Sequence, residues 1–170
     1  MNLKSYIREI PDFPSQGILF KDITPLLKDA SAMGAALDAL TDLVGNQDID
    51  IVVGMESRGF LFGPLLAQRF NAAFVPVRKP GKLPALTTSI SYDLEYGSDT
   101  LEIHTDGIQK GQKVLVHDDI LATGGTARAT CELIERLGGD IVQCNFLIEL
   151  GFLKGVERLD AFDVKSVMKY

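Results

Sequence analysis

Short apolar runs recur along the chain and alternate with segments of helical spacing. Four of these runs have the length of a strand: DIDIVVGM (48–55), AAFVPVR (72–78), KVLVHDD (113–119) and DIVQCNFLI (140–148). Near-continuous apolar runs are typical of strands that are buried on both faces of a parallel sheet. We therefore predict four sheet strands at these positions.

Two segments have the spacing of amphipathic helices: residues 31–44, before the first strand, and residues 125–137, between the third and fourth. The alternation of strands and helices predicts an α/β fold, with an open, mostly parallel twisted sheet flanked by helices. In such folds ligands bind outside the carboxyl ends of the strands. Motifs that follow a strand directly are therefore the first candidates for a functional site.

Two regions interrupt this alternation. Residues 1–30 contain PDFPSQGILFKDITP, which is rich in Pro and Gly around the apolar island ILF. Residues 80–107 contain SISYDLEYGSDTLEIH, whose alternating polarity around Gly-Ser-Asp predicts a β-hairpin. A hairpin between two core strands is a candidate flexible lid. We expect one domain over residues 1–170, with the first region as a small N-terminal hood segment.

Length, composition and charge narrow the classes of function. The 170 residues are 46% hydrophobic and 24% charged, the balance of an ordinary globular domain. A formal charge of −6 and a pI near 4.9 argue against general binding to nucleic acid or to an anionic membrane. An anionic ligand would need a local site that works against the overall charge.

The cysteines and the N-terminal segment indicate the cellular compartment in which the protein is expected. Cys131 and Cys144 are the two cysteines, and no CxxC or Cys/His cluster suggests a metal site. The segment MNLKSYIREIPDF has no apolar signal-peptide core, and no apolar stretch approaches the roughly 18 residues of a membrane span. We expect reduced, buried thiols in a cytoplasmic protein that does not enter a membrane.

The stretch KVLVHDDILATGGT (113–126) combines two acids with a turn of small and hydroxyl residues. The strand brings Asp118 and Asp119 to its carboxyl end, where the vicinal hydroxyls of a ribose can donate to them. A Gly-rich turn then enters a helix, and its backbone N–H groups can hold a phosphate. That turn consists of Ala122, Thr123, Gly124, Gly125 and Thr126. Because neither a Walker A loop nor a GxGxxG motif is present, a ribose 5-phosphate is the ligand that satisfies both halves.

VLVHDDILATGGTA resembles the phosphoribosyl-pyrophosphate motif of the type I phosphoribosyltransferases. Five further segments are similar, in the same order, to those of the adenine phosphoribosyltransferases: PDFPSQGILFKDITPLLKD, ESRGFLFGPLLA, VRKPGKLP, LEYGSDTLEIH and GFLKG. The resemblance runs from about residue 5 to the C-terminus. It implies the type I phosphoribosyltransferase fold and the purine-salvage reaction of adenine with phosphoribosyl pyrophosphate, which gives AMP and diphosphate.

The resemblance assigns the segment GMESRGF to the pyrophosphate group. It implies a non-proline cis peptide between Glu56 and Ser57, which would direct the backbone amides of Ser57 and Gly59 at the pyrophosphate. The Arg58 guanidinium suits a leaving group of high negative charge. A surface cation without such a role is the plainer explanation of Arg58.

Three cations, Arg78, Lys79 and Lys82, stand within five residues of each other in VRKPGKLP. A solvated charged loop is the ordinary explanation of such a cluster. The resemblance implies instead that these side chains bind pyrophosphate oxygens. It leaves open whether Arg78 or Lys79 acts in its own subunit or across a dimer interface.

The resemblance also implies a base site. Phe20 would stack on one face of adenine, and Leu150 would cover the other. Backbone groups of Ile18 and Lys21 would read the 6-amino group and N1 of the base. Such a site rejects 6-oxopurines, because the donor at position 6 becomes an acceptor. Phe20 as an ordinary core residue is the alternative.

Catalysis is expected to rest on holding the ribose, neutralising the pyrophosphate and excluding water. The resemblance implies Mg²⁺ held by substrate oxygens and water, with no direct protein ligand but near Asp118 and Asp119. Glu95 on the hairpin is the candidate for proton transfer at the purine, as acid, base or gate. Tyr96 would close over the site, and a homodimer is expected.

Two other functions stay open on the sequence alone. A phosphoribosyltransferase for hypoxanthine, guanine or xanthine would share most of these motifs. A non-catalytic regulator that senses phosphoribosyl pyrophosphate is less favoured, because no DNA-binding domain is expected and an acidic chain does not suit RNA. His117 stands where the family usually has an apolar residue. Strand alternation turns it away from the Asp118 side, so we expect a buried core histidine.

Overall fold

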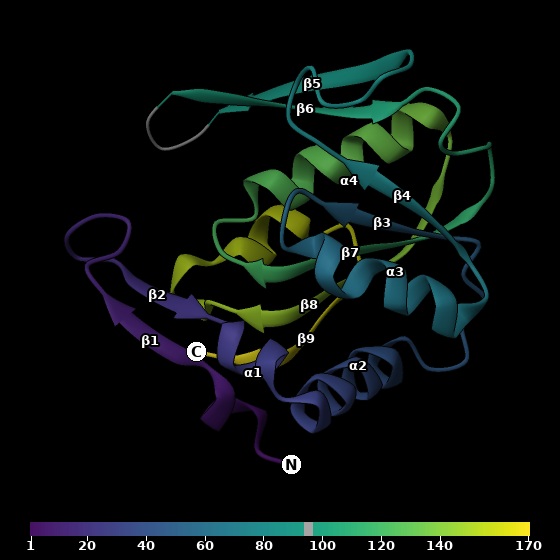
Figure 1. Cartoon of the computed structure of the whole chain (residues 1–170). Helices are drawn as coiled ribbons and strands as arrows, with labels where there is room; N and C mark the ends of the chain where they lie inside the picture. The colour runs from purple at the N-terminus through teal and green to yellow at the C-terminus, as the bar shows by residue number, and fades with distance from the viewer. Residues whose placement is uncertain (94–96) are drawn as a thin grey trace. The chain divides into compact units, whose positions relative to one another are not determined.

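The computed structural model describes residues 1–93 and 97–170, with Asp93 described by its backbone alone. Within these residues the chain forms two compact units, Met1–Ala39 and Leu40–Tyr170. Figure 1 shows the elements of both. Glu95 and Tyr96 lie outside the described residues, so their roles stay predictions. The expectation of one domain also stays a prediction.

The first unit contains a small antiparallel sheet that the sequence pattern did not reveal. A 3-10 helix at Leu3–Tyr6 precedes two paired strands, β1 (Arg8–Pro11) and β2 (Leu19–Asp22). Helix α1 (Thr24–Lys28) follows, and helix α2 (Ala30–Val44) begins in this unit and ends in the second. The Asp22 carboxylate holds the turn into α1, because it accepts hydrogen bonds from Arg8 Nη2 at 2.7 Å and from the Thr24 amide at 2.9 Å.

The second unit is built on a five-stranded sheet with the strand order β4-β3-β7-β8-β9 (Figure 1). Every neighbouring pair is parallel. The predicted strands are confirmed as β3 (Ile51–Met55), β4 (Ala73–Val77), β7 (Lys113–Leu121) and β8 (Asp140–Glu149). The edge strand β9 (Val164–Lys169) was not predicted, and two 3-10 helices at Gly151–Leu153 and Gly155–Leu159 connect it to β8.

Helices cover both faces of this sheet, as an α/β fold requires (Figure 1). Helix α4 (Gly125–Leu137), which the sequence predicts, lies on one face. Helix α3 (Gly59–Phe70), which it does not predict, lies on the other. All five residues of β3 are buried, which agrees with the unbroken apolar run in the sequence. Of the helices in the described part of the chain, none is long and apolar enough to cross a membrane.

The expected hairpin is confirmed as β5 (Thr87–Asp93) and β6 (Ser98–His104), which pair antiparallel. Ile90, Leu101 and Ile103 of the hairpin are buried in the same core as the sheet and α4. Backbone hydrogen bonds of 2.9 and 2.7 Å also join Glu102 to Arg78 after β4. The described strands of the hairpin therefore pack against the core, and the role of the hairpin as a lid stays a prediction.

Candidate active site

Three loops that carry predicted site residues follow neighbouring parallel strands. Strand β3 ends at Met55, β4 at Val77 and β7 at Leu121. Because parallel strands present their carboxyl ends at one edge of the sheet, the three loops gather at that edge. Strand β7 continues to Leu121, beyond the predicted run of 113–119, so Asp118 and Asp119 lie within the strand and not at its last residues.

A cavity of about 210 Å³ lies where β7 passes into α4. Its lining includes Asp118 and every residue of the predicted phosphate turn; the full set is Asp118, Ile120, Leu121, Ala122, Thr123, Gly124, Gly125, Thr126, Ala127 and Phe146. Helix α4 begins at Gly125, and the first amides of a helix have no partner within it. The cavity therefore offers backbone donors and threonine hydroxyls to an anion.

Glycine is required at position 124 of this turn. Its φ is 81°, in the left-handed region that side chains rarely adopt. A Cβ there would also overlap the carbonyl oxygen of Gly155. The GG pair of the sequence motif thus lets the chain turn tightly from β7 into α4.

The paired acids face different partners. Asp118 lines the cavity, and its Oδ1 accepts a hydrogen bond from the Asp119 amide at 2.8 Å. Asp119 is only 2% exposed, and its Oδ2 lies 3.1 Å from Arg58 Nε in an ion pair that lacks hydrogen-bond geometry. The structure thus separates one acid that lines the cavity, Asp118, from one that pairs with a cation, Asp119.

The two acids also influence each other's ionisation. Burial raises the pKa of Asp118 well above its ordinary value, and the negative charge of Asp119 raises it further. Burial also raises the pKa of Asp119, although the Arg58 guanidinium opposes that shift. A cationic or hydroxyl-bearing ligand at Asp118 would offset the cost of keeping both carboxylates charged.

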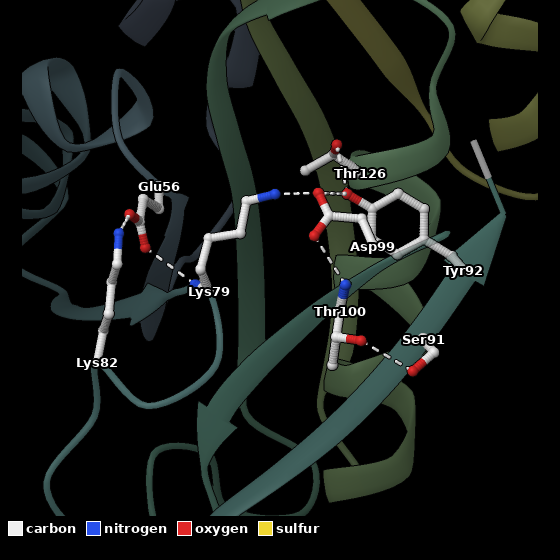
Figure 2. A network of polar contacts seen from close by, with 8 residues as sticks. All are labelled: Glu56, Lys79, Lys82, Ser91, Tyr92, Asp99, Thr100 and Thr126. Atoms are coloured by element: carbon white, nitrogen blue, oxygen red, sulfur yellow. Dashed lines mark hydrogen bonds and ion pairs between the residues drawn. The ribbon is translucent and has the colours of Figure 1, made fainter. Parts of the chain in front are cut away.

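Glu56 binds several residues of the loop that follows β4. We call this segment, residues 78–82, the cation loop. Glu56 Oε2 accepts the Lys79 amide at 2.9 Å, and Glu56 Oε1 pairs with Lys82 Nζ (Figure 2). Glu56 Oε2 also lies 3.3 Å from Arg78 Nε. Burial alone would raise the pKa of Glu56. The hydrogen bonds from Lys82 and Lys79 and the nearby cations outweigh that effect and lower it. The structure thus brings the predicted pyrophosphate residues of two loops together.

The expected cis peptide between Glu56 and Ser57 is confirmed. Gly59, the first residue of α3, packs directly against β7. A Cβ there would lie 2.9 Å from the carbonyl oxygen of His117, so a larger residue would push α3 away from the strand. The GMESRGF segment therefore sits firmly against the strand that carries Asp118 and Asp119.

Two residues beside the cation loop were missed by the sequence analysis. Asp99 Oδ2 pairs with Lys79 Nζ and lies 3.4 Å from the Tyr92 hydroxyl. The same hydroxyl lies 3.0 Å from Thr126 Oγ1 in the phosphate turn (Figure 2). Tyr92 and Asp99 are cross-strand partners in the hairpin, whereas the sequence pattern put Asp99 in the Gly-Ser-Asp turn, so only the strand register reveals this pair.

The predicted adenine residues belong to different units. Ile18 is 45% exposed, and its backbone N–H and C=O are both used in a local turn with Ser15 and Phe13. Phe20 is half-buried and meets Phe13 edge to face, with ring centroids 5.1 Å apart. Lys21 is buried and pairs with Glu9. Leu150 follows β8 in the second unit. Their joint role in a base site stays a prediction.

His117 is a buried core residue, as predicted. It has no exposed surface, and its Nδ1 lies 3.1 Å from the Asn145 carbonyl oxygen and 3.2 Å from Asn145 Oδ1. Burial lowers the pKa of His117 to about 4, so the ring is neutral near pH 7. Within residues 1–93 and 97–170, no group of three or more His, Cys, Asp or Glu side chains could hold a metal ion.

Comparison with known proteins agrees with this geometry. Residues 26–167 match the family model of the phosphoribosyl transferase domain. The adenine phosphoribosyltransferase of Christiangramia forsetii is 62% identical over 170 residues, which cover 100% of this chain and 99% of that protein.

Two solved structures extend the match to three dimensions. The adenine phosphoribosyltransferase of Rhodothermus marinus superposes with a TM-score of 0.95 at 53% identity, over 99% of this chain and 96% of that chain. The Saccharomyces cerevisiae enzyme superposes with a TM-score of 0.91 at 44% identity, over 97% of this chain and 96% of that chain.

The chain therefore belongs to the phosphoribosyl transferase family. Within that family its activity is that of an adenine phosphoribosyltransferase, a pentosyltransferase that makes AMP in purine salvage. Neither a 6-oxopurine enzyme nor a non-catalytic regulator is supported by these comparisons.

Proposed function

We propose that this chain binds phosphoribosyl pyrophosphate across the carboxyl edge of its sheet and transfers the phosphoribosyl group to adenine. The observation that carries this assignment is the cavity of about 210 Å³, which is lined by Asp118 and the whole 122–126 turn. Two cation-bearing loops follow strands of the same sheet, at the same edge.

The 5-phosphate is assigned to the turn at the start of α4. Backbone N–H groups of Gly124 to Thr126 and the hydroxyls of Thr123 and Thr126 are donors, and a helix N-terminus favours negative charge. Asp118 accepts from the ribose hydroxyls beside this turn. Asp119 acts through Arg58, because it already holds that guanidinium at 3.1 Å.

The diphosphate is assigned to the amides and side chains around Glu56–Gly59 and to Arg78, Lys79 and Lys82. As the bond between ribose C1 and the diphosphate oxygen breaks, a bond from C1 to adenine N9 forms, and N9 loses its proton. Cations that are already oriented stabilise the departing diphosphate without reorganisation. Glu95 is the proposed acceptor of the N9 proton, and Tyr96 is proposed to shield the site.

Magnesium is proposed as a substrate-borne cofactor. When it is bound with phosphoribosyl pyrophosphate, it would shield the charge of the diphosphate oxygens. The donor chemistry fits, because Mg²⁺ prefers oxygen ligands and keeps several waters. The Asp118 carboxylate lines the cavity and could reach the ion through such a water.

Adenine is assigned to Ile18, Phe20, Lys21 and Leu150. Support comes from the Saccharomyces cerevisiae relative, which was solved with adenine and D-2,5-dideoxy-2,5-imino-altritol 1,6-bisphosphate. We further propose a homodimer and a cytoplasmic location. The free, buried thiols of Cys131 and Cys144 fit a reducing compartment.

A coupled assay of diphosphate release tests this function. With phosphoribosyl pyrophosphate and Mg²⁺ present, we expect adenine to start diphosphate release and hypoxanthine to support less than about 1% of that rate, because a site built for one hydrogen-bond pattern rejects the other by about 10⁴-fold. Asp118→Asn should raise KM for phosphoribosyl pyrophosphate. Equal rates with the two bases would contradict the adenine assignment. Unchanged kinetics of Asp118→Asn would contradict the ribose assignment.

A further inference from the structure

A chain of polar contacts links the cation loop to the phosphate turn through the hairpin (Figure 2). Lys79 Nζ pairs with Asp99 Oδ2, and the other oxygen of Asp99 accepts the Thr100 amide at 2.8 Å. The Tyr92 hydroxyl lies 3.4 Å from Asp99 Oδ2 and 3.0 Å from Thr126 Oγ1. One hydroxyl thus bridges the partner of Lys79 to a residue that lines the phosphate cavity.

Asp99 carries a full negative charge next to Lys79. The hydrogen bond from Lys79 lowers the pKa of Asp99, and the Thr100 amide adds to this effect against the opposing effect of burial. Burial raises the pKa of Tyr92, so its hydroxyl keeps its proton near neutral pH and can donate to the carboxylate. The Lys79 ammonium is therefore neutralised by a carboxylate in the structure described.

The hairpin holds this carboxylate in a defined place. Tyr92 and Asp99 are cross-strand neighbours in β5 and β6, and the Tyr92 ring packs beside Gly125 at the start of α4. Backbone hydrogen bonds between Glu102 and Arg78 fix β6 to the cation loop. Asp99 is thus neither a free surface acid nor a residue of the predicted site.

We propose that Asp99 is a positioning residue that competes with the pyrophosphate group for Lys79. The carboxylate keeps the ammonium oriented while the site is empty and releases it when a pyrophosphate oxygen arrives. When diphosphate leaves, Asp99 takes Lys79 back. This inference rests on the proposed assignment of Lys79 to the pyrophosphate group.

Competition predicts the direction in which the affinity for pyrophosphate should change. Pyrophosphate must break the pair between Lys79 and Asp99 and must approach a carboxylate of like charge. Removing the charge of Asp99 should therefore strengthen pyrophosphate binding, whereas removing a residue that only supports the fold should weaken it. The side chains of Lys79 and Asp99 are 42% and 23% exposed, so solvent screens the pair and the effect is moderate.

Calorimetric titration with inorganic pyrophosphate and Mg²⁺ tests the inference. We expect Asp99→Asn to lower Kd by about two- to fivefold, the range that an exposed ion pair supports. Asp99→Glu keeps the charge and should stay within about twofold of the unaltered protein. Ser91→Ala removes the 2.9 Å hydroxyl contact to Thr100 in the same hairpin without touching Lys79, and should leave Kd unchanged.

Unchanged or weaker binding by Asp99→Asn would overturn the inference, and so would equal tightening by Asp99→Glu. Lys79→Ala separates this result from a failure of the proposed function. If Lys79→Ala leaves Kd unchanged, the pyrophosphate assignment of Lys79 is itself wrong. If Lys79→Ala weakens binding and Asp99→Asn has a smaller effect in that variant than in the unaltered protein, the competition acts through this pair; an equal effect in both would show charge repulsion alone and would overturn the inference.

Discussion

At the scale of single residues, His117 shows how a polar side chain can be structural in the middle of a functional motif. Its buried ring hydrogen-bonds Asn145 of β8 and lies edge to face with Phe62 of α3. Asn145 in turn donates to the Leu40 carbonyl oxygen at the end of α2 at 3.0 Å. His117 is therefore part of a buried polar network that joins the sheet to a helix end.

This burial predicts a specific dependence of stability on pH. The unfolded imidazole takes up a proton near pH 6.5, whereas the folded protein resists protonation until about pH 4. Between these values protons bind the unfolded chain preferentially, so the free energy of unfolding falls as pH falls. From the size of the shift, the loss reaches about 3 kcal/mol at pH 4, and above pH 6.5 the group contributes nothing.

Urea unfolding of His117→Leu and the unaltered protein between pH 8 and pH 4 measures this effect. The variant lacks the titrating ring, so its stability should decline less steeply in acid. Any constant cost of leaving Asn145 without its donor shifts the variant equally at every pH. Two curves that run parallel from pH 8 to pH 4 would contradict the linkage.

The sequence predicts site residues well where the motif is contiguous and poorly where it is not. Asp118 and the 122–126 turn stand within nine residues of one another, so one strand–turn–helix unit carries their geometry. Asp99 meets Lys79 across 20 positions, and Tyr92 meets Thr126 across 34. Only the packing of the hairpin brings such pairs together, and no local pattern contains that information.

At the scale of elements, the helix that the sequence failed to predict is the most informative. Helix α3 begins GFLFGP, and both Gly and Pro64 are poor residues for a helix interior. Its glycines serve contacts with other elements. A Cβ on Gly63 would lie 2.5 Å from the ring of Phe74 in β4. Local propensity is weak here because tertiary packing of α3 on the sheet decides the outcome.

Close packing of α3 on the sheet also predicts whether a substitution at Gly63 raises or lowers the free energy of unfolding. Helix propensity alone favours Gly63→Ala by about 1 kcal/mol. The Phe74 ring cannot move away easily, because Gly54 and Phe60 also border it. We expect overpacking to win, with a net loss of about 1–2 kcal/mol in the free energy of unfolding by urea.

Gly34→Ala in α2 is the matched control for Gly63→Ala. Nothing lies within 4 Å of a Cβ at Gly34, so this variant should gain up to about 1 kcal/mol. Stabilisation of both variants would show that propensity, and not close packing, governs position 63.

At the scale of the whole molecule, the sequence predicts the α/β architecture because each buried parallel strand has its own apolar run. It misses β1, β2 and β9, which are short or half-exposed and carry no such run. The site lies at the carboxyl edge for a topological reason, so the fold locates it before any single residue does. The formal charge of the chain is −6, and the site cations Arg58, Lys79 and Lys82 each form an ion pair with an acid of the same unit.

The two buried thiols can report on the stability of this whole arrangement. Cys131 in α4 and Cys144 in β8 have no exposed surface, and their sulfur atoms lie 3.6 Å apart in the core. The neighbouring Cys131 thiol, together with burial, raises the pKa of Cys144, so the folded protein holds an unreactive thiol. Reaction with a thiol reagent such as DTNB should therefore require the core to open.

A ligand that binds only the folded state should slow that reaction. At a concentration of 100 times its Kd, AMP would stabilise the folded state by about 2.7 kcal/mol, which corresponds to roughly 100-fold slower labelling. Monitoring DTNB reaction with and without AMP measures the ratio, and adenosine, which lacks the 5-phosphate, is the matched ligand control. Fast labelling that AMP does not slow would contradict this expectation. It would mean that α4 separates from β8 locally, while the phosphate turn at the N-terminus of α4 stays folded.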